Sequence, residues 1–594
     1  MKNLPGRLTG ESKIITELML HLLPVQILMS AVGMINGTIT SLFASNCIGS
    51  EAMGAVGLFS PVVQLMGACN IMLVGGSQIL CARYLGKNES ERISGVFSLD
   101  IILTAVLSGA VTGFLLFLAI FNLTGILGAN EQIRPVLNTY ILGQVIGILP
   151  KLLNSHFSAF LSLENQRRRT TAASIVYIFV NFLLVYLFVP VMHMGVLGLA
   201  LAASIGQWVL FLIQGLYYLR GKSSFRFSLK GCDAGEIREI FKIGIPGSLS
   251  QGYQTIRRYI VNILVIRFVG NIGLSAYSTV DAFLVFFWAF PMGMLAVSRM
   301  MIGISVGEED RKSLEDIMRT VLFCFVPLLF VLAILLMLFA DPITRLYYQD
   351  PSQPIYQMVR WGFRILPFGL PLSCICIHFV CYGQNSGKQV LVHLLSLFDG
   401  VLCTSLFSAI LLPVIGIRGL FVAEILNGLV NLITVVVYAA VCGGHFPRSV
   451  EDLLAMSKSF GVSEENRIDI SLQSMDEVVA ISEEIEAFCL EHGMDYRRAY
   501  YSALSMEEMA GNVVQHGFSG DRKKHSIDVR VSIKEEDLIL RIKDDCRKFD
   551  PVRVRELVAP EDAASNIGIR MILRIAKDVS YQNILGLNVL TVRI

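Results

Sequence analysis

Charged residues are scarce in this 594-residue sequence, where Asp, Glu, Lys and Arg together make up only 16%. Soluble globular chains usually carry about 25% charge, whereas 54% of the residues here are hydrophobic. The charges that are present nearly cancel, leaving a formal net charge of +2. Because nucleic-acid binding proteins attract their partner with a basic excess, we expect no nucleic-acid partner. Most of the chain is expected to lie in a lipid bilayer.

Three sequence patterns are also missing, and each absence removes a class of function. No CxxC pair or His/Cys cluster has zinc-site spacing, and the 12 cysteines lie mostly inside apolar runs, as free buried thiols do. No G-x-x-x-x-G-K-[ST] phosphate loop is present, which argues against an ABC-type motor. The polar N-terminus, MKNLPGRLTGESKIITE, has no signal-peptide cleavage pattern, so the first apolar run is expected to remain as a membrane helix.

Long apolar stretches, by contrast, are abundant from residue 14 to about residue 442. Each is close to the ~20 residues that a helix needs to cross a bilayer. About twelve such helices are expected, at residues 15–44, 53–84, 96–122, 137–162, 171–192, 196–219, 241–266, 275–305, 318–340, 358–383, 389–413 and 417–441. The fold class is therefore an all-α polytopic membrane protein, followed by a separate C-terminal unit.

The apolar part of the chain repeats itself. Gly86 in GKNESER and Gly307 in GEEDRKS both open a polar loop after a long helix, 221 residues apart (307 minus 86). The same separation relates two further pairs of glycines, Gly49 with Gly270 and Gly195 with Gly416. One separation that holds across three loops indicates two halves of six helices each. An even number of helices in each half gives a parallel repeat, with its axis along the membrane normal.

The distribution of Lys and Arg predicts the orientation. The loops YLGKNESER, ENQRRRT, YYLRGKSSFRFSLK, EEDRKS and SGKQ carry most of the positive charge, while the alternate loops carry almost none. Positively charged loops face the cytoplasm, so both termini are expected to be cytoplasmic in a multi-pass plasma-membrane protein. The expected units are an N-terminal half at 1–222, a second half at 223–445, a linker at 446–465 and a soluble domain at 466–594.

The first 430 residues resemble the multidrug and toxic compound extrusion family. The resemblance lies in the two six-helix halves, in GAVGL…P after the first loop, and above all in GGSQILCARYLGKNESER. It implies two helical bundles around a central cavity that opens alternately to either side. It also implies that a Na⁺ or H⁺ gradient drives export of small organic, often cationic, compounds. Many members have an acidic residue in the first helix, where Thr40 stands in this chain.

Five ionisable residues lie inside the expected membrane helices, mostly in the second half. Such residues are costly in lipid and mark functional sites by default. They are candidates to line the transport cavity: Arg257, Arg258, Asp281, Asp399 and Glu424. A carboxylate in an apolar cavity can bind a proton or a cation reversibly. The alternative is an internal ion pair, such as Arg257 with Asp281, that only holds the second half together. Three intramembrane histidines, His156, His378 and His393, are expected mainly to be structural.

The stretch SMEEMAGNVVQHGF at 505–518 points to a different chemistry. Glu508 and Asn512 are four residues apart and share one face of the expected helix, where a carboxylate and an amide can polarise water and ligate Mg²⁺. His516 follows one turn later. Two strands in HSIDVRVSIKEEDLILRIKD come next, then DDCRKFDP, a helix and two closing strands. This order indicates an α+β domain.

These segments resemble the GHKL ATPase fold, and especially the anti-sigma-factor serine kinases. The resemblance implies ATP or ADP with Mg²⁺ as ligand, Asn512 as the Mg²⁺ ligand and Glu508 as general base. It further implies that Asp544 contacts the adenine amino group and that Gly568 lies near the phosphates, at a helix N-terminus suited to anions. A cytosolic regulatory protein of the anti-sigma-antagonist type is the expected partner. The chain departs from the family's glycine pattern at four positions: Cys546, Lys548, Ser565 and Asn566.

The sequence therefore predicts a secondary efflux transporter fused to a nucleotide-binding regulatory domain. Two alternatives remain open. The first is a flippase of the same superfamily that moves a lipid-linked or anionic substrate, which the membrane arginines and the missing first-helix acid favour. The second is a membrane sensor that signals through its kinase-like domain.

Overall fold

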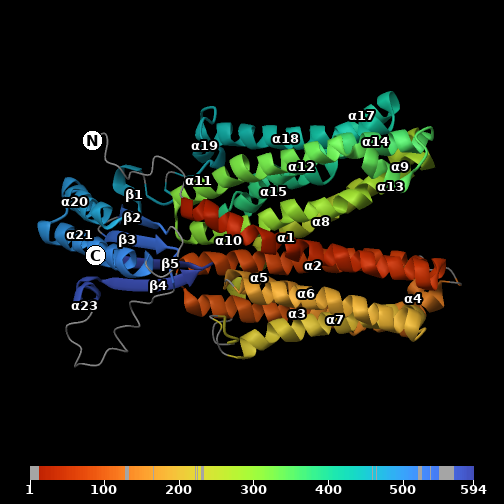
Figure 1. The fold of residues 1–594 in the computed structure, drawn as a ribbon, viewed down its shortest axis with the longest axis horizontal. Helices are drawn as coiled ribbons and strands as arrows, with labels where there is room; N and C mark the ends of the chain where they lie inside the picture. The colour runs from red at the N-terminus through yellow and green to blue at the C-terminus, as the bar shows by residue number, and fades with distance from the viewer. Residues whose placement is uncertain are drawn as a thin grey trace.

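The computed structural model describes residues 13–547 and 567–594, apart from residues 88, 128–130, 132, 165, 221–222, 224, 229–232, 458, 463, 519–524 and 535–536. A long helical bundle fills most of the structure, and a smaller α+β domain lies against one end of it (Figure 1). We call this the domain-side end of the bundle. Helix α1 (Lys13–Phe43) begins there, and α10 (Ala289–Gly307) ends there.

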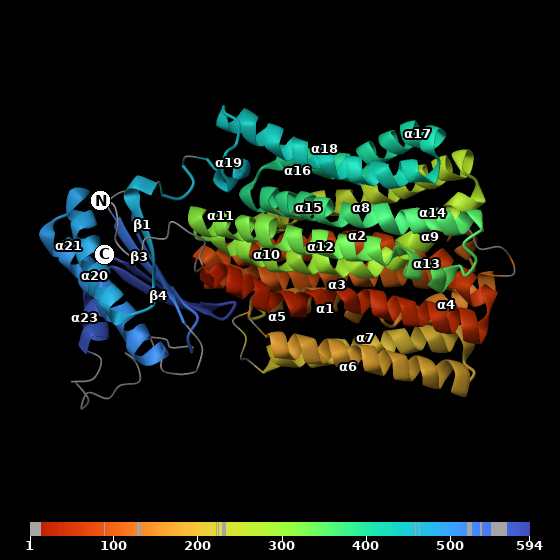
Figure 2. The ribbon, with the colours of Figure 1, turned by 45° about the horizontal axis from the view of Figure 1, so that its top comes forward.

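The bundle is built from two consecutive sets of helices, coloured red to yellow and green to cyan in Figures 1 and 2. The first half contains α1, α2 (Ser50–Lys87), α3 (Ser90–Ile120), α4 (Arg134–Val145), α5 (Ile148–Leu163), α6 (Arg167–Tyr186) and α7 (Gly195–Leu219). The second half contains α8 (Ala234–Phe268), α9 (Asn271–Leu284), α10, α11 (Arg311–Thr320), α12 (Val326–Leu338), α13 (Ala340–Tyr347), α14 (Pro354–Ile365), α15 (Gly369–Ser386), α16 (Gln389–Leu397), α17 (Cys403–Ile415) and α18 (Ile417–Gly443).

Ten helical segments of the described chain are long and apolar enough to cross a membrane. An eleventh is the pair α4 and α5, which bends by 47° at its break. The twelfth expected span, at 241–266, is the middle of α8, which is long enough to cross but does not pass the same test. The difference arises because this stretch carries Arg257, Arg258 and several glutamines and serines among its apolar residues.

The internal repeat is visible in the backbone. Each of the aligned glycines at the helix starts has a positive φ: 122° at Gly49, 85° at Gly270, 56° at Gly195 and 61° at Gly416. This conformation suits glycine because it has no Cβ. The same local turn therefore opens the corresponding helices of both halves.

The two halves touch closely at the domain-side end, through the third repeated glycine pair. A Cβ added to Gly86 would lie 2.3 Å from the carbonyl oxygen of Ile304, and one added to Gly307 would lie 2.1 Å from that of Arg83. The two contacts are equivalent under the repeat. Arg83 also donates a hydrogen bond of 2.9 Å to the carbonyl of Gln384. Small residues thus let α2 and α10 approach backbone to backbone.

The C-terminal domain contains one antiparallel sheet in the order β1-β2-β3-β5-β4. Its strands are β1 (Arg467–Leu472), β2 (Ile527–Lys534), β3 (Asp537–Asp544), β4 (Asp578–Ile584) and β5 (Leu587–Arg593). Helices α20 (Met475–Glu491), α21 (Tyr496–Asn512) and α23 (Ile567–Ile575) belong to the same domain. Helices α20 and α21 lie on the side of the sheet away from the bundle (Figures 1 and 2).

Residues alternate along the strands, as expected for a sheet with two different faces. In β3, Leu538, Leu540 and Ile542 are buried in the domain core, whereas Arg541 and Lys543 point to the other face. The domain core is formed by these apolar residues and the helices above them. The polar face is turned toward the bundle, where its ion pairs are described below.

Candidate functional site

Three of the five intramembrane charges come together in the second half. Arg257 on α8 places Nη1 3.4 Å from Oε2 of Glu424 on α18. The same atom donates to the backbone carbonyl of Asp399 at 3.4 Å. Thr404 on α17 donates to Glu424 at 3.4 Å. The side chains of Arg257 and Glu424 are 20% and 19% exposed, so neither is fully enclosed by the neighbouring helices.

Asp399 is held by amides rather than by a cation. Its Oδ1 accepts hydrogen bonds from Asn427 at 3.0 Å and from Asn431 at 3.4 Å, both on α18. Asp399 lies in a π-helical turn, Phe398–Leu402, a distortion often found at functional sites. Gly400 in this turn permits the approach of α8, because an added Cβ would lie 2.5 Å from Cβ of Tyr253.

The remaining two candidates stand apart from this cluster. Arg258 is exposed on α8, and Asp281 on α9 is half-buried. Among the described residues, the ion partner of Arg257 is Glu424 and not Asp281. The structural pair anticipated from the sequence is thus formed with a different carboxylate.

The first half contains a buried polar network that sequence reasoning missed in part. Asp100 on α3 and His156 on α5 are both 0% exposed, and His156 Nδ1 lies 2.6 Å from Asp100 Oδ2. Ser77 donates to Asp100 at 2.6 Å, and Asn70 Oδ1 lies 2.9 Å from His156 Nε2. The signal was available, because Asp100 is the one acid of the apolar run expected at 96–122.

The other intramembrane positions have simpler surroundings. His378 places Nδ1 2.6 Å from the carbonyl oxygen of Cys374, one turn earlier on α15. His393 is exposed on α16. Thr40, at the position where the family often has an acid, donates to the carbonyl of Asn36 at 3.0 Å.

In the C-terminal domain, the residues expected to bind nucleotide lie on elements that pack together. Glu508 and Asn512 are half-buried on α21, and His516 is exposed in the π-helical turn Val513–Gly517 that continues this helix. Helix α21 packs on α23 and on β3. Gly568 lies in the first turn of α23, at a helix N-terminus as the resemblance implies.

Asp544 ends β3 and is only 5% exposed. Burial raises the pKa of this carboxyl, although hydrogen bonds from Asn588 at 2.8 Å and from the backbone N–H of Cys546 at 3.0 Å favour the ionised form. These bonds fix the carboxylate at the C-terminal end of β3, the central strand of the sheet. An acceptor fixed in this way can take a hydrogen bond from an amino group.

The glycine replacement at Cys546 is accommodated without backbone strain. Cys546 is not among the described non-glycine residues with positive φ, so it does not need the conformation reserved for glycine. Its thiol packs against Gly517, where an added Cβ would lie 2.9 Å from the sulfur. The other departures, Lys548, Ser565 and Asn566, lie outside the described residues.

One group of side chains in the described part of the chain has the composition of a metal site. Ligand atoms of His525, Asp545 and Cys546 all lie within 4.8 Å of one another. His525 Nδ1 already lies 2.9 Å from Asp545 Oδ1, so the group is also explained by this hydrogen bond.

Together, the two repeated helical halves, the polar cluster within the second half and the appended sheet domain define a membrane transporter with a C-terminal ATPase-like domain. The sequence profile described as MatE matches residues 25–187 and 246–410. The profile described as Histidine kinase-like ATPase domain matches residues 473–594. The chain belongs to the MatE family of multidrug efflux transporters, and both resemblances inferred from sequence motifs are confirmed.

Similar proteins support this assignment over the helical part. The chain is 23% identical over 419 residues to the probable multidrug resistance protein YpnP of Bacillus subtilis, covering 69% of this chain and 91% of that protein. It is 24% identical over 351 residues to the probable multidrug resistance protein NorM of Acinetobacter baylyi, covering 58% and 76%.

Solved structures share the fold. A crystal structure of MATE in complex with MaD3S has a TM-score of 0.65 at 22% identity, covering 71% of this chain and 94% of that chain. A MOP superfamily transporter from Pyrococcus furiosus, described as having a binding pocket of reverse polarity, has a TM-score of 0.65 at 21% identity, covering 73% and 97%.

Proposed function

We propose that this protein exports small organic compounds across the plasma membrane in exchange for Na⁺ or H⁺, by alternating opening of its two halves. The observation that carries the proposal is the partly accessible cluster of Arg257, Glu424 and Asp399, drawn from three segments of the second half. Carboxylates in such a place can bind a cation or a proton and release it on the other side.

The C-terminal domain would lie in the cytosol. The helices that precede the loops rich in Lys and Arg, α2, α5, α7, α10 and α15, end at the same end of the bundle as the C-terminal domain (Figure 1). The rule that positive loops are cytoplasmic therefore gives the domain access to cytosolic nucleotide.

The arrangement of charges suggests how ion binding would be coupled to a rearrangement of the helices. Glu424 holds Arg257, while Asp399 is held by two asparagine amides. A proton or Na⁺ at Glu424 would weaken its hold on Arg257 and free that side chain to reorient. Ion binding and rearrangement of α8 against α18 are thereby linked through one ion pair.

Substitution of Glu424 by Gln is expected to lower ion-driven efflux about tenfold, because the ion pair and the ion-binding charge are lost together. The measurement is efflux of ethidium from cells that lack their own exporters, with a protonophore and a sodium ionophore used to identify the coupling ion. Asp350→Asn, at an exposed loop acid, is the control. Efflux by Glu424→Gln equal to that by the control would contradict the role of the cluster.

A flippase or anion exporter of the same superfamily is the second candidate. Arg257 in the polar cluster and Thr40 in place of a first-helix acid favour it. The structural neighbour from Pyrococcus furiosus, described as having a pocket of reverse polarity, shows that a related fold can differ in this respect. Export of an anionic dye such as calcein, with no export of ethidium, would favour this candidate.

We further propose that the C-terminal domain binds ATP or ADP with Mg²⁺, through Asn512 as metal ligand and Asp544 at the adenine. Glu508 would be placed to act as general base for hydrolysis or for phosphotransfer to a regulatory protein partner. Gly568 and His516 would contact the phosphate end of the nucleotide. The support is the packing of α21, α23 and β3 around these residues.

Asn512→Ala is expected to weaken binding of Mg²⁺-ADP at least about tenfold, since an oxygen ligand of the metal is removed. Isothermal titration of the full chain in detergent measures the change. Asn466→Ala, at an exposed asparagine outside the site, serves as the matched control. Equal binding by both variants would place the nucleotide elsewhere, and no binding by the unaltered chain would refute the proposed ligand.

A further inference from the structure

The tip of the β4–β5 hairpin is unusually apolar for the end of a soluble domain. The turn consists of Leu585 and Gly586, with φ of 55° and 94°, between Ile584 and Leu587. Two-residue turns with both φ values positive favour Asn-Gly or Asp-Gly. A leucine at the first position is an outlier, and it persists only where the surroundings compensate.

The hairpin tip is buried against the helical bundle. Leu585 is 2% exposed and Leu587 is 9% exposed, and both belong to the main buried cluster of the bundle. The tip shares a small cavity with Ile15 and Leu18 of α1 and with Met301 and Ile304 of α10. Because α1 belongs to the first half and α10 to the second, the tip lies across the seam between the halves.

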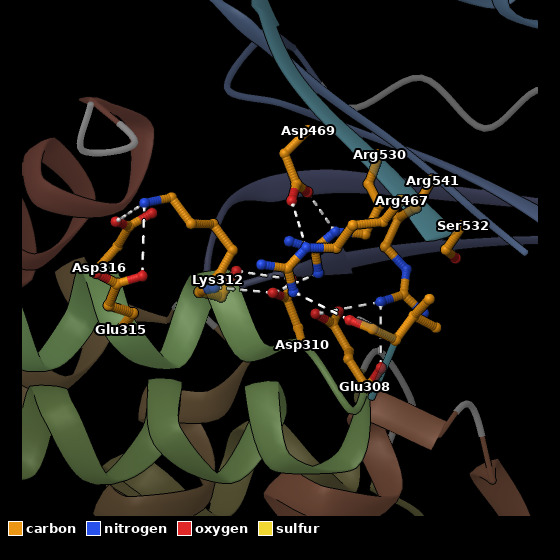
Figure 3. Close-up of polar contacts among 12 residues, drawn as sticks. Glu308, Asp310, Lys312, Glu315, Asp316, Arg467, Asp469, Arg530, Ser532 and Arg541 are labelled. Atoms are coloured by element: carbon orange, nitrogen blue, oxygen red, sulfur yellow. Dashed lines mark hydrogen bonds and ion pairs between the residues drawn. The ribbon is translucent and has the colours of Figure 1, made fainter. Parts of the chain in front are cut away.

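The polar face of the sheet adds a layer of ion pairs, shown in Figure 3. Arg530 of β2 pairs with both Asp310 of the α10–α11 loop and Asp469 of β1. Lys543 of β3 places Nζ 2.8 Å from Glu308 and 3.2 Å from Asp310. The same loop is thus held by two neighbouring strands.

The α10–α11 loop itself holds the carboxylate of Asp310 in place. Asp310 also accepts a hydrogen bond of 2.8 Å from the N–H of Ser313 as the N-cap of α11. Burial alone would raise the pKa of Asp310, but Arg530 and Lys543 beside it hold that pKa well below its usual range. The carboxylate therefore stays ionised at neutral pH.

The linker is hydrogen-bonded and ion-paired to the second half. Arg311 of α11 pairs with Glu451 at 2.7 Å and donates to the carbonyl of Phe460 at 2.7 Å. Tyr382 of α15 donates to the carbonyl of Leu454 at 2.9 Å. From this anchored position, the hairpin tip extends to α1 of the first half.

The tip and the contact between the halves share Ile304. Ile304 lines the cavity beside the tip, and its carbonyl oxygen faces Gly86 across the seam. Opening the bundle at the domain-side end would separate Gly86 from Ile304 and α1 from α10. The tip would then lose the site in which it is buried.

We propose that the β4–β5 tip and the basic face of the sheet form a clasp that holds the domain-side end of the transporter closed. The inference rests on the alternating opening proposed above.

The clasp also adjoins the candidate nucleotide site, because Lys543 and Asp544 are consecutive on β3 and face opposite sides of the sheet. Asn588, which holds Asp544, likewise lies between Leu587 and Val589 of the tip strand. A ligand at Asp544 therefore acts on the strands that carry the clasp.

Leu585→Asn tests the clasp without harming the hairpin. Asn-Gly is the preferred pair for this turn, so the domain itself keeps or gains stability, while the apolar contact with α1 and α10 is lost. Lys543→Glu is the second variant, because it sets a carboxylate against Glu308 and Asp310. Arg497→Glu, at an exposed arginine of α21, is the control.

Two readouts are taken on the full chain. Hydrogen exchange reports docking, at peptides from the hairpin tip and the α10–α11 loop. Double electron–electron resonance measures the distance between the two halves at the domain-side end. The nitroxides are attached to ketone-bearing residues introduced at the exposed positions Glu91 and His445. In both variants we expect exchange at the tip to rise about tenfold, which corresponds to 1.4 kcal/mol, and a longer distance population to appear.

Two other outcomes overturn the clasp, and a third overturns the proposed transport. Faster exchange at the tip with unchanged distances would mean that the docked domain does not keep the domain-side end of the bundle closed. Unchanged exchange in both variants would mean that these contacts do not hold the domain. A distance change in a chain that exports neither ethidium nor calcein would leave the clasp in place and refute the proposed transport instead.

Discussion

Replacing Gly76 by alanine is expected to abolish transport, whereas the same change at the adjacent Gly75 is expected to preserve it. A Cβ at Gly76 would lie 2.2 Å from the carbonyl oxygen of Ile240 on α8, while a Cβ at Gly75 would meet nothing within 4 Å. The clashing atom belongs to backbone, so α2 and α8 must move apart. The closed domain-side end could not form in the Gly76 variant.

Comparing the Gly76 and Gly75 variants separates the steric clash between α2 and α8 from the change in helix propensity. Both glycines lie within α2, where alanine is favoured over glycine by about 1 kcal/mol, so Gly75→Ala should be slightly stabilising. Ethidium efflux is expected to fall at least about tenfold in Gly76→Ala, since the closed state must lose more than 1.4 kcal/mol to the clash. Equal efflux by the two variants would show that this contact is not part of the working cycle.

The second large effect on transport is expected from substitution of one of the two adjacent arginines of α8. Arg257→Ala is expected to lower transport more than about tenfold, because it leaves the half-buried Glu424 without its ion partner, and an unpaired charge away from bulk water is costly. Arg258→Ala is expected to change transport less than about twofold, since exposed charges contribute little. The two substitutions remove the same charge from the same helix, one residue apart.

Initial rates of ethidium and calcein efflux, normalised to the amount of protein in the membrane, measure this pair. Arg257→Lys adds a useful comparison, because lysine keeps the charge but lacks the planar guanidinium. Loss of transport in Arg258→Ala together with normal transport in Arg257→Ala would reverse the assignment and move the substrate path to the exposed side of α8.

Much of the helical architecture follows from the sequence. The glycine pairs 221 residues apart predicted two equivalent halves, and the positive φ at Gly49 and Gly270 shows that the repeat extends to the backbone. Hydropathy located the helices because each bilayer span needs a long apolar run. It was less informative for α8, where Arg257 and its polar neighbours reduce the apolar character of a helix that is still continuous.

The polar sites were only partly predictable. A single charge in an apolar run is easy to see, as at Asp399, but its partner depends on which helices pack together, so Glu424 rather than Asp281 was found beside Arg257. Asp100 stands in a similar run and was overlooked, although it pairs with His156.

The docking of the domain could not be read from the sequence. The alternation in β3 is typical of a sheet with one apolar and one polar face, but nothing in it says what the polar face contacts. The apolar tip at Leu585 is unusual for a two-residue turn, but the sequence does not say what covers it. Only its near-complete burial, against helices more than 280 residues earlier in the chain, reveals the contact with the transporter.

The most direct test of the whole account is ethidium transport by the purified chain in proteoliposomes, driven by an imposed Na⁺ or H⁺ gradient, with and without Mg²⁺-ATP on the side of the C-terminal domain. We expect a gradient alone to drive transport, and Mg²⁺-ATP to change its rate in the unaltered chain but not in Asn512→Ala. Transport that no gradient drives, or an ATP effect that persists in Asn512→Ala, would contradict the account.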